Sequence, residues 1–202
     1  MVDYVHNDDI AEGLAGIDPD ECALLIIDEL GEVEGTPMEG ALLKPTLNTA
    51  RLAKIARSKG IPVIFTNDAH IEGIDHELEL WGNHGIAGSD AAQPSPQLEL
   101  QEGDFVIEKP KYSAFFQTRL RSLLGDLGVK VLILCGFDTN ICVQHTAADA
   151  YFNRFELVLV EDATATFLIG TQEGGLEYMQ KCYAARIATT DEVASLFESK
   201  QA

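Results

Sequence analysis

The stretch LILCGFDTNICVQHTAADA, from Leu132 to Ala150, decides the fold of this chain. Its first residues form a continuous apolar run up to Cys135, which is typical of a strand buried on both faces of a parallel sheet. A few polar residues follow, and a helical pattern opens near Cys142. A strand that leads into a helix is the repeating unit of α/β folds. The stretch therefore predicts an α/β protein and places a thiol at the start of a helix.

Five other short apolar segments are also predicted to be buried parallel strands. They are CALLII (22–27), PVIFTN (62–67), DFVIEK (104–109), ELVLV (156–160) and RIATT (186–190). Helical patterns fill most of the intervals, at 45–60, 118–128, 139–152, 176–183 and 190–200. This alternation predicts one sheet with right-handed crossovers. Residues 69–103 show no clear strand or long helix, and a loop of that length with a Trp and three His favours a functional role.

The overall composition excludes several classes of partner. We expect the 202 residues to form a single domain, 1–202, in which residues 1–20 are a loosely attached arm. A net charge of −19 argues against nucleic acid or an anionic membrane, because phosphate groups attract Lys and Arg. No apolar run approaches the roughly 18 residues that span a bilayer. The polar N-terminus and four scattered cysteines predict a soluble, cytoplasmic protein without a disulfide framework.

Reactive side chains follow four of the predicted strands. They are Asp28 after the first, Asp68 and His70 after the second, Lys109 at the end of the third, and Cys142 after the fourth. In open α/β sheets the site lies beyond the carboxyl ends of the strands. The sequence therefore predicts that a nucleophile, a base and a charge partner meet at one edge of the sheet.

Cys142 is the candidate nucleophile. The first turn of a helix exposes unpaired N–H groups and a partial positive charge, which we expect to lower the pKa of the thiol. The same N–H groups can hold the oxygen of a tetrahedral intermediate. The alternative is a buried helix cysteine that fills a gap in the core, as we expect for the other three cysteines.

Asp28 is the candidate base, because a carboxylate that follows four apolar residues is partly desolvated and its pKa rises. Glu29 is its rival. Lys109 would offset the negative charges of Asp28 and a Cys142 thiolate, and Lys111 is its rival.

Three motifs carry a family resemblance: IID, EKPKYSAFFQT and GFDTNICVQHTAADA, in this order. They resemble the isochorismatase-like cysteine hydrolase superfamily, whose amidase members include nicotinamidase and N-carbamoylsarcosine amidase. The resemblance implies a catalytic triad of Asp28, Lys109 and Cys142. It implies a three-layer, doubly wound fold with helices on both faces of a six-stranded parallel sheet ordered 3-2-1-4-5-6.

The resemblance also implies two further features of the site. One is an oxyanion hole formed by the backbone N–H groups of Asp138 and Cys142, with a cis peptide between Phe137 and Asp138. The other is a divalent metal site. Its implied ligands are Asp68, His70 and His84, with His76 as a spare candidate. Two imidazoles and one carboxylate suit zinc, which we expect, or manganese or iron.

Aromatic residues are candidates for the walls of a substrate pocket: Trp81, Tyr112, Phe115 and Phe137, with packing in the core as the alternative. Two positions depart from the nicotinamidase pattern. Val33 stands where many members carry an aromatic shortly after the catalytic Asp, and Gly82 rather than Pro follows Trp81. The sequence therefore does not identify the substrate.

The sequence predicts a cysteine-dependent amidohydrolase, nicotinamidase-like, that releases ammonia from a small amide through a thioester intermediate. One alternative is an N-carbamoyl (ureido) amidase of the same superfamily. Another is a catalytically idle, doubly wound binding protein. A doubly wound nucleotide-binding module is a third, although no strand is followed by a Gly-rich phosphate loop. By resemblance we also expect a homo-oligomer, a dimer or a tetramer.

Overall fold

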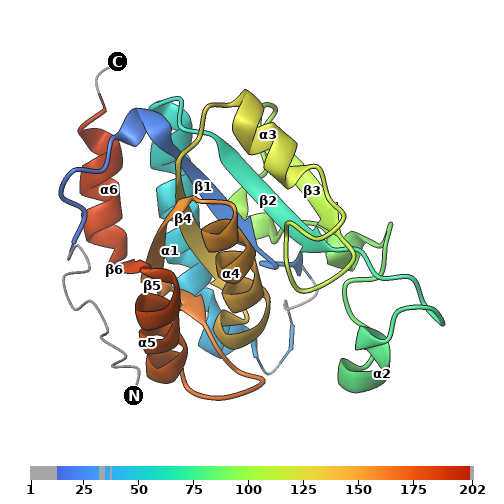
Figure 1. Cartoon of the computed structure of the whole chain (residues 1–202). Coiled ribbons are helices and arrows are strands. Elements are labelled where there is room, and N and C mark those ends of the chain that lie inside the picture. The colour runs from blue at the N-terminus through green and yellow to red at the C-terminus, as the bar shows by residue number, and fades with distance from the viewer. Residues whose placement is uncertain (1–12, 32–34, 37, 201–202) are drawn as a thin grey trace, which may run out of the picture.

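A computed structural model of the chain describes residues 13–31, 35–36 and 38–200. Its centre is a six-stranded sheet in the order β3-β2-β1-β4-β5-β6, in which all neighbouring strands are parallel (Figure 1). The strands are β1 (Cys22–Ile27), β2 (Val63–Asp68), β3 (Phe105–Lys109), β4 (Val131–Phe137), β5 (Glu156–Ala165) and β6 (Arg186–Ala188). The predicted fold and strand order are confirmed. Val33 and the first twelve residues of the predicted arm lie outside the described residues.

The two central strands place the site. Every residue of β1 and β4 is buried, as their continuous apolar sequence predicts. They pair in register from Cys22 opposite Val131 to Ile27 opposite Gly136. Both strands therefore end at the same level, and the residues that follow them begin side by side at the carboxyl edge of the sheet.

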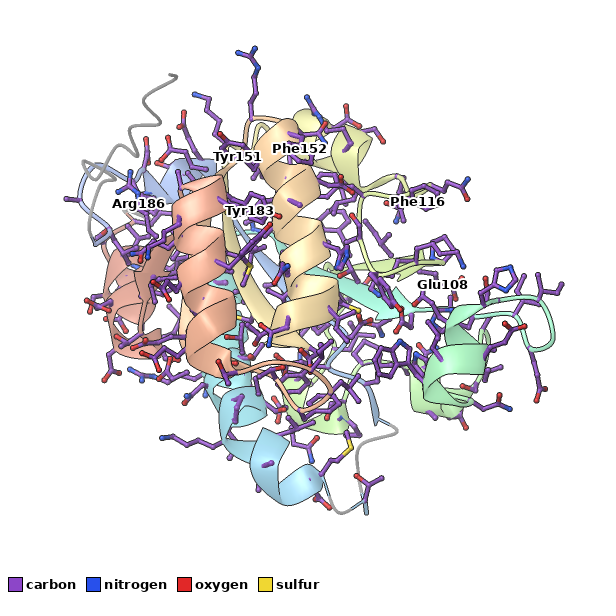
Figure 2. All side chains as sticks on the ribbon, turned by 60° about the horizontal axis from the view of Figure 1, so that its bottom comes forward. Glu108, Phe116, Tyr151, Phe152, Tyr183 and Arg186 are labelled. Carbon is purple, nitrogen blue, oxygen red and sulfur yellow. The ribbon has the colours of Figure 1, made fainter. Side chains whose placement is uncertain are left out.

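Helices cover both faces of the sheet (Figure 1). One face packs on α3 (Leu120–Asp126), α4 (Gln144–Phe152) and α5 (Gln172–Tyr183), which contribute Leu124, Ala147 and Met179 to the core. The other face packs on α1 (Glu39–Ser58) and α6 (Thr190–Glu198), which contribute Leu52 and Phe197. Aromatic side chains of α4 and α5 also pack on one another at the surface: Tyr151, Phe152 and Tyr183 (Figure 2).

Two helices begin earlier than the sequence pattern predicts. Helix α1 begins at Glu39, so that Pro45 lies inside it and removes one backbone hydrogen bond. The extra turn is stabilised by burial of Leu42. Helix α5 begins at Gln172, where the side chain of Thr171 accepts a hydrogen bond from the N–H of Gly174. The first residues of both helices lack a repeat of apolar residues, so the apolar pattern does not predict where α1 and α5 begin.

The long loop between β2 and β3, residues 69–104, extends past the β3 side of the sheet (Figure 1) and is called the arm from here on; it is distinct from the predicted N-terminal arm. It contains the short helix α2 (Glu77–Trp81) and two 3₁₀ turns, η3 (Asp90–Ala92) and η4 (Pro96–Leu98). The arm returns to its own start: the N–H of His70 donates to Gly85 O at 2.8 Å, and the N–H of Ala87 donates to His70 O at 2.9 Å. These bonds bring His84 back to the edge of the sheet. No described helix is long and apolar enough to cross a membrane.

Candidate active site

Asp28, Lys109 and Cys142 meet at the carboxyl edge of the sheet. Lys109 Nζ lies 2.7 Å from Asp28 Oδ2 and 3.6 Å from Cys142 Sγ. The Asp28 carboxylate lies within 4.8 Å of the same sulfur. Lys109 is fully buried at the end of β3, and Cys142 lies in a π-helical turn, η5 (Thr139–Val143), between β4 and α4. The three predicted residues are thus within contact or single-water distance of one another.

Asp68 is a fourth member of this cluster. Its carboxylate forms a second ion pair with Lys109, and its N–H donates to Asp28 Oδ1 at 2.9 Å. Asp28 itself has φ +50°, in the left-handed region that residues other than glycine rarely adopt. Strained backbone of this kind concentrates at functional sites, where the surrounding contacts hold it. Here the bond from Asp68 N–H and the ion pair with Lys109 hold the Asp28 carboxylate.

Two groups of the cluster carry fixed charges. Burial works against the ammonium of Lys109, yet the adjacent carboxylates of Asp28 and Asp68 raise its pKa well above the ordinary value. Burial alone would raise the pKa of Asp68, but the charge of Lys109 and the nearby imidazole of His70 lower that pKa below its usual range. Lys109 and Asp68 are therefore both ionised at neutral pH and balance each other.

The other two groups carry the mobile proton. Burial, with the charge of Asp68, raises the pKa of Asp28 to about 7. Burial, which outweighs the attraction of Lys109, raises the pKa of the Cys142 thiol well above its ordinary value. The prediction that the helix start lowers the thiol pKa is therefore wrong, because desolvation and two nearby carboxylates dominate. The resting thiol is protonated and needs a base.

Both rivals named from the sequence lie elsewhere. The Glu29 carboxylate accepts a hydrogen bond from Thr49 Oγ1 of α1 at 2.6 Å, on the other face of the sheet. Lys111 Nζ pairs with Asp75 Oδ1 at 2.7 Å and is partly exposed. Neither is part of the cluster around the thiol, where the carboxylates of Asp28 and Asp68 and the ammonium of Lys109 lie.

The peptide bond between Phe137 and Asp138 is trans, as are all bonds among the described residues, so the predicted cis bond is wrong. Gly136, the next-to-last residue of β4, has φ +113° and lies at an irregularity in the pairing of β4 with β5. A Cβ atom at Gly136 would lie 1.9 Å from Ile27 O, so only glycine fits here against β1. Asp138 then caps the π-helical turn, with its side chain accepting from Asn140 N.

The three predicted metal ligands come together next to the triad. Ligand atoms of Asp68, His70 and His84 lie within 4.8 Å of one another, and the two imidazole rings are 4.9 Å apart. Both ring nitrogens of His70 are buried without a hydrogen-bond partner. Buried polar atoms are normally paired, so these nitrogens fit a bound cation. His76 is exposed and pairs only with Glu79, so it does not serve as the spare ligand.

Glu77 is a candidate ligand that the sequence reasoning missed. Its Oε2 is buried without a hydrogen-bond partner, 3.7 Å from His70 Nε2. Burial and the charge of Asp68 raise the pKa of Glu77. The available signal was its place in the arm, seven residues from both His70 and His84. A second carboxylate would complete a set of two imidazoles and two carboxylates.

A cavity of about 490 Å³ opens above Cys142. Three predicted wall residues, Trp81, Tyr112 and Phe137, line it, and Trp81 Nε1 donates to Tyr112 Oη at 2.9 Å. The prediction for Phe115 is wrong, because this ring packs on the core 5.9 Å from Phe155. The sequence reasoning missed several further lining residues: Leu30, Met38, Ile141, Phe167 and Leu168. All but Ile141, which belongs to the GFDTNIC motif, come from segments without a recognisable motif.

The fold and site together define a doubly wound α/β enzyme with a buried thiol, carboxylate and ammonium at the edge of its sheet. The family model described as the Isochorismatase domain matches residues 22–192. The chain therefore belongs to the isochorismatase family.

Similar proteins include several amidases. Nicotinamidase 3 of Arabidopsis thaliana is 36% identical over 152 residues, which cover 72% of this chain and 73% of the relative. The crystal structure of N-carbamoylsarcosine amidase from Thermoplasma acidophilum has a TM-score of 0.78 and 30% identity, covering 85% and 97% of the two chains. Pyrazinamidase of Pyrococcus horikoshii, solved in complex with zinc, has a TM-score of 0.72 and 28% identity, covering 84% and 99%. The predicted family and enzyme class, a hydrolase of C–N bonds, are confirmed.

Proposed function

We propose that this protein is a cysteine-dependent amidohydrolase that releases ammonia from a small, uncharged primary amide. The observation that carries the proposal is the convergence of Cys142, Asp28 and Lys109, with 3.6 Å between the sulfur and the ammonium. A protonated thiol, a base with a pKa of about 7 and a permanent positive charge are the groups that nucleophilic attack on an amide requires.

In the proposed first half of the reaction, Cys142 Sγ attacks the amide carbonyl while Asp28 takes the thiol proton. The new S–C bond forms a tetrahedral intermediate, whose oxygen accepts hydrogen bonds from the N–H groups of Asp138 and Cys142. The C–N bond then breaks, and Asp28 passes its proton to the leaving nitrogen, which departs as ammonia. Lys109 stays charged throughout and stabilises the Asp28 carboxylate and the developing thiolate.

In the second half, water replaces ammonia at the acyl carbon. Asp28 takes a proton from the water, the S–C bond breaks, and the carboxylic acid product leaves. Asp28 returns the proton to the Cys142 thiolate, which restores the protonated thiol that burial favours. The cycle consumes one amide and one water and needs no other reactant.

We further propose that Asp68, His70, Glu77 and His84 hold a divalent metal ion, with zinc expected. The buried, unpartnered atoms of His70 and Glu77 support this assignment. When bound, such an ion offers open coordination positions to a polar atom of the substrate or to water. Three of these residues, Asp68, Glu77 and His84, also line the cavity, so the ion would orient the substrate relative to Cys142.

The charge of the cavity favours a neutral substrate. Its acidic lining residues are Asp28, Asp68, Glu77 and Asp138, His84 lies beside them, and no Lys or Arg of the described chain lines it. A substrate with its own carboxylate would lack a cationic side chain there. The similarity to N-carbamoylsarcosine amidase still makes a ureido substrate the second candidate, and one assay can separate the two.

The test is ammonia release from nicotinamide, pyrazinamide and N-carbamoylsarcosine by protein purified without chelator, with and without added zinc or manganese. We expect turnover of at least one ring amide and little turnover of the carboxylate-bearing ureido compound. Turnover of the ureido compound alone would transfer the assignment to the second candidate. Absence of turnover, with a Cys142 that does not react with iodoacetamide, would indicate a binding protein instead.

A further inference from the structure

Three consecutive side chains of the GFDTNIC motif, Asp138, Thr139 and Asn140, form hydrogen bonds with one neighbouring segment, the loop 166–171 and the first residue of α5, Gln172. This loop joins β5 to α5 and supplies Phe167 and Leu168 to the cavity. The motif therefore does more than place the nucleophile. It also holds a wall of the cavity that is distant in sequence.

The carboxylate of Asp138 is the centre of this contact. It is buried and accepts four hydrogen bonds. The donors are Asn140 N (2.8 Å), Thr166 Oγ1 (2.7 Å), Phe167 N (2.7 Å) and Leu168 N (3.0 Å). Two of these donors are the backbone N–H groups of the residues whose side chains form the wall. A carboxylate that accepts consecutive N–H groups fixes the backbone between them.

Asn140 holds the far end of the loop. Its Nδ2 donates to Ile169 O at 2.5 Å and to Thr171 O at 3.2 Å. Space for Asn140 is left by Gly175 in α5, where an added Cβ would lie 1.8 Å from Asn140 Oδ1. The loop is therefore tied at both ends to the turn that carries Cys142.

The wall that is held in this way faces the substrate space. The ring of Phe167 packs edge-on to Phe137 with 6.4 Å between centroids, and both line the cavity with Cys142. Phe167 and Leu168 are 39% and 46% exposed, although both are large and apolar. Their exposure at the cavity places them where a bound apolar group would cover them.

We propose that Asp138 is a positioning residue whose carboxylate fixes Phe167 and Leu168 as the outer wall of the cavity, and that this wall limits the size of the amide that reaches Cys142. The proposal deepens the proposed function and rests on it, since it assigns a specificity role around the same thiol. It is separate from the oxyanion role of the Asp138 backbone N–H, which an Asp138→Asn substitution retains.

Two measurements test the proposal in the intact protein. The first is hydrogen exchange of the Phe167 and Leu168 amides. Asp138→Asn replaces one acceptor oxygen by an NH₂ group, and we expect exchange to become faster by about tenfold. The matched control is Asp162→Asn. Asp162 accepts from Thr190 N and Thr190 Oγ1, both at 2.8 Å, at the start of α6, and is absent from the cavity lining.

The second measurement is alkylation of Cys142, followed by peptide mass spectrometry. The ratio of its rate with iodoacetamide to its rate with the bulkier iodoacetanilide reports size selection. We expect Asp138→Asn and Phe167→Ala each to lower this ratio by about tenfold, and Asp162→Asn to leave it unchanged. A general loss of stability would affect both aspartate variants alike, so a change confined to Asp138→Asn reports positioning.

Unchanged amide exchange in Asp138→Asn would overturn the proposal, because the carboxylate would not hold the loop. Faster exchange with an unchanged alkylation ratio in both Asp138→Asn and Phe167→Ala would overturn it as well, because the wall would not select by size. A Cys142 that is inert to both reagents in every variant contradicts the proposed function itself, which distinguishes the two failures.

Discussion

At the scale of single residues, the site separates fixed from mobile charge. Lys109 and Asp68 form an ion pair whose pKa values both shift away from neutrality. The remaining proton is shared between Asp28, with a pKa of about 7, and a thiol whose pKa is raised. A base with a pKa close to the working pH is efficient in both directions of proton transfer.

This arrangement predicts how activity depends on pH. Because Asp28 must be ionised to take the thiol proton, kcat/KM for a turned-over amide should rise with pH through about 7. Asp28→Asn should lower kcat by roughly 10²–10⁴-fold, since Asn cannot accept the proton. Steady-state rates across the pH range measure both effects. A flat profile on the acid side of neutrality would contradict the assignment of Asp28 as the base.

Glu29 predicts a separate effect of pH on stability. Burial raises the pKa of Glu29 to about 8, so the folded protein keeps this proton while the unfolded chain loses it. The unfolded state then binds fewer protons, and the free energy of unfolding falls as pH rises from the ordinary Glu pKa toward 8, by up to ~1.4 kcal/mol per pH unit.

Glu29→Gln should remove this decline, because the amide carries no proton to lose and retains an acceptor for Thr49. The free energy of unfolding, obtained from urea titrations below the ordinary Glu pKa and above pH 8, measures this decline in both proteins. The variant should gain stability relative to the wild-type protein mainly on the alkaline side. An equal difference on both sides would show that Glu29 does not titrate in this range.

At the scale of elements, the arm between β2 and β3 completes the proposed metal site. The start of the arm places His70 next to Asp68 at the end of β2. The hydrogen bond from His70 N–H to Gly85 O then brings His84 to the same two residues. Between them the short helix α2 presents Glu77. The ligand set therefore depends on the way the arm folds back as well as on the strand end.

Glu77→Gln should lower the metal content of protein purified without chelator, because it removes one anionic ligand. Asp68→Ala should lower it further. His76→Ala is the matched control, since His76 lies one residue from Glu77 but is exposed and away from the cluster. Elemental analysis by mass spectrometry gives the metal per chain. Equal metal in wild-type protein, Glu77→Gln and Asp68→Ala would contradict the site.

The strands were predictable because β1 and β4 are continuous apolar runs and polar residues mark the carboxyl ends of β1 and β2. Their order followed from the family resemblance and not from the apolar pattern. Asp28, Asp68, Lys109 and Cys142 follow from that pattern. The roles of Asp138 and Glu77 did not follow, since each acts through residues brought close only by a loop. The raised thiol pKa was missed because sequence position shows a helix start but not the depth of burial.

At the scale of the whole molecule, salt should screen the charges of the surface much more than the charges of the site. The chain carries 33 acidic and 14 basic residues, for a net charge of −19. Repulsion among exposed carboxylates destabilises the compact state and is screened by salt. The cluster around Lys109 is buried, so salt screens it much less.

Added salt should therefore stabilise the fold. Raising KCl from about 0.02 M to about 0.2 M shortens the Debye length and should raise the thermal unfolding midpoint. Scanning calorimetry at both concentrations measures the change, with sucrose at equal osmolality as a control for solvent exclusion. A midpoint that falls with KCl would show that attractive surface pairs such as Arg51–Asp191 outweigh the repulsion.

The central claim is that the sulfur of Cys142 forms the covalent bond to the substrate. Ammonia release by Cys142→Ala tests it most directly, with Cys182→Ala as a control because Cys182 is exposed. We predict that Cys142→Ala, with an unchanged circular dichroism spectrum, loses activity by at least about a thousandfold, whereas Cys182→Ala retains it. Ammonia release at the wild-type rate from folded Cys142→Ala would contradict the account.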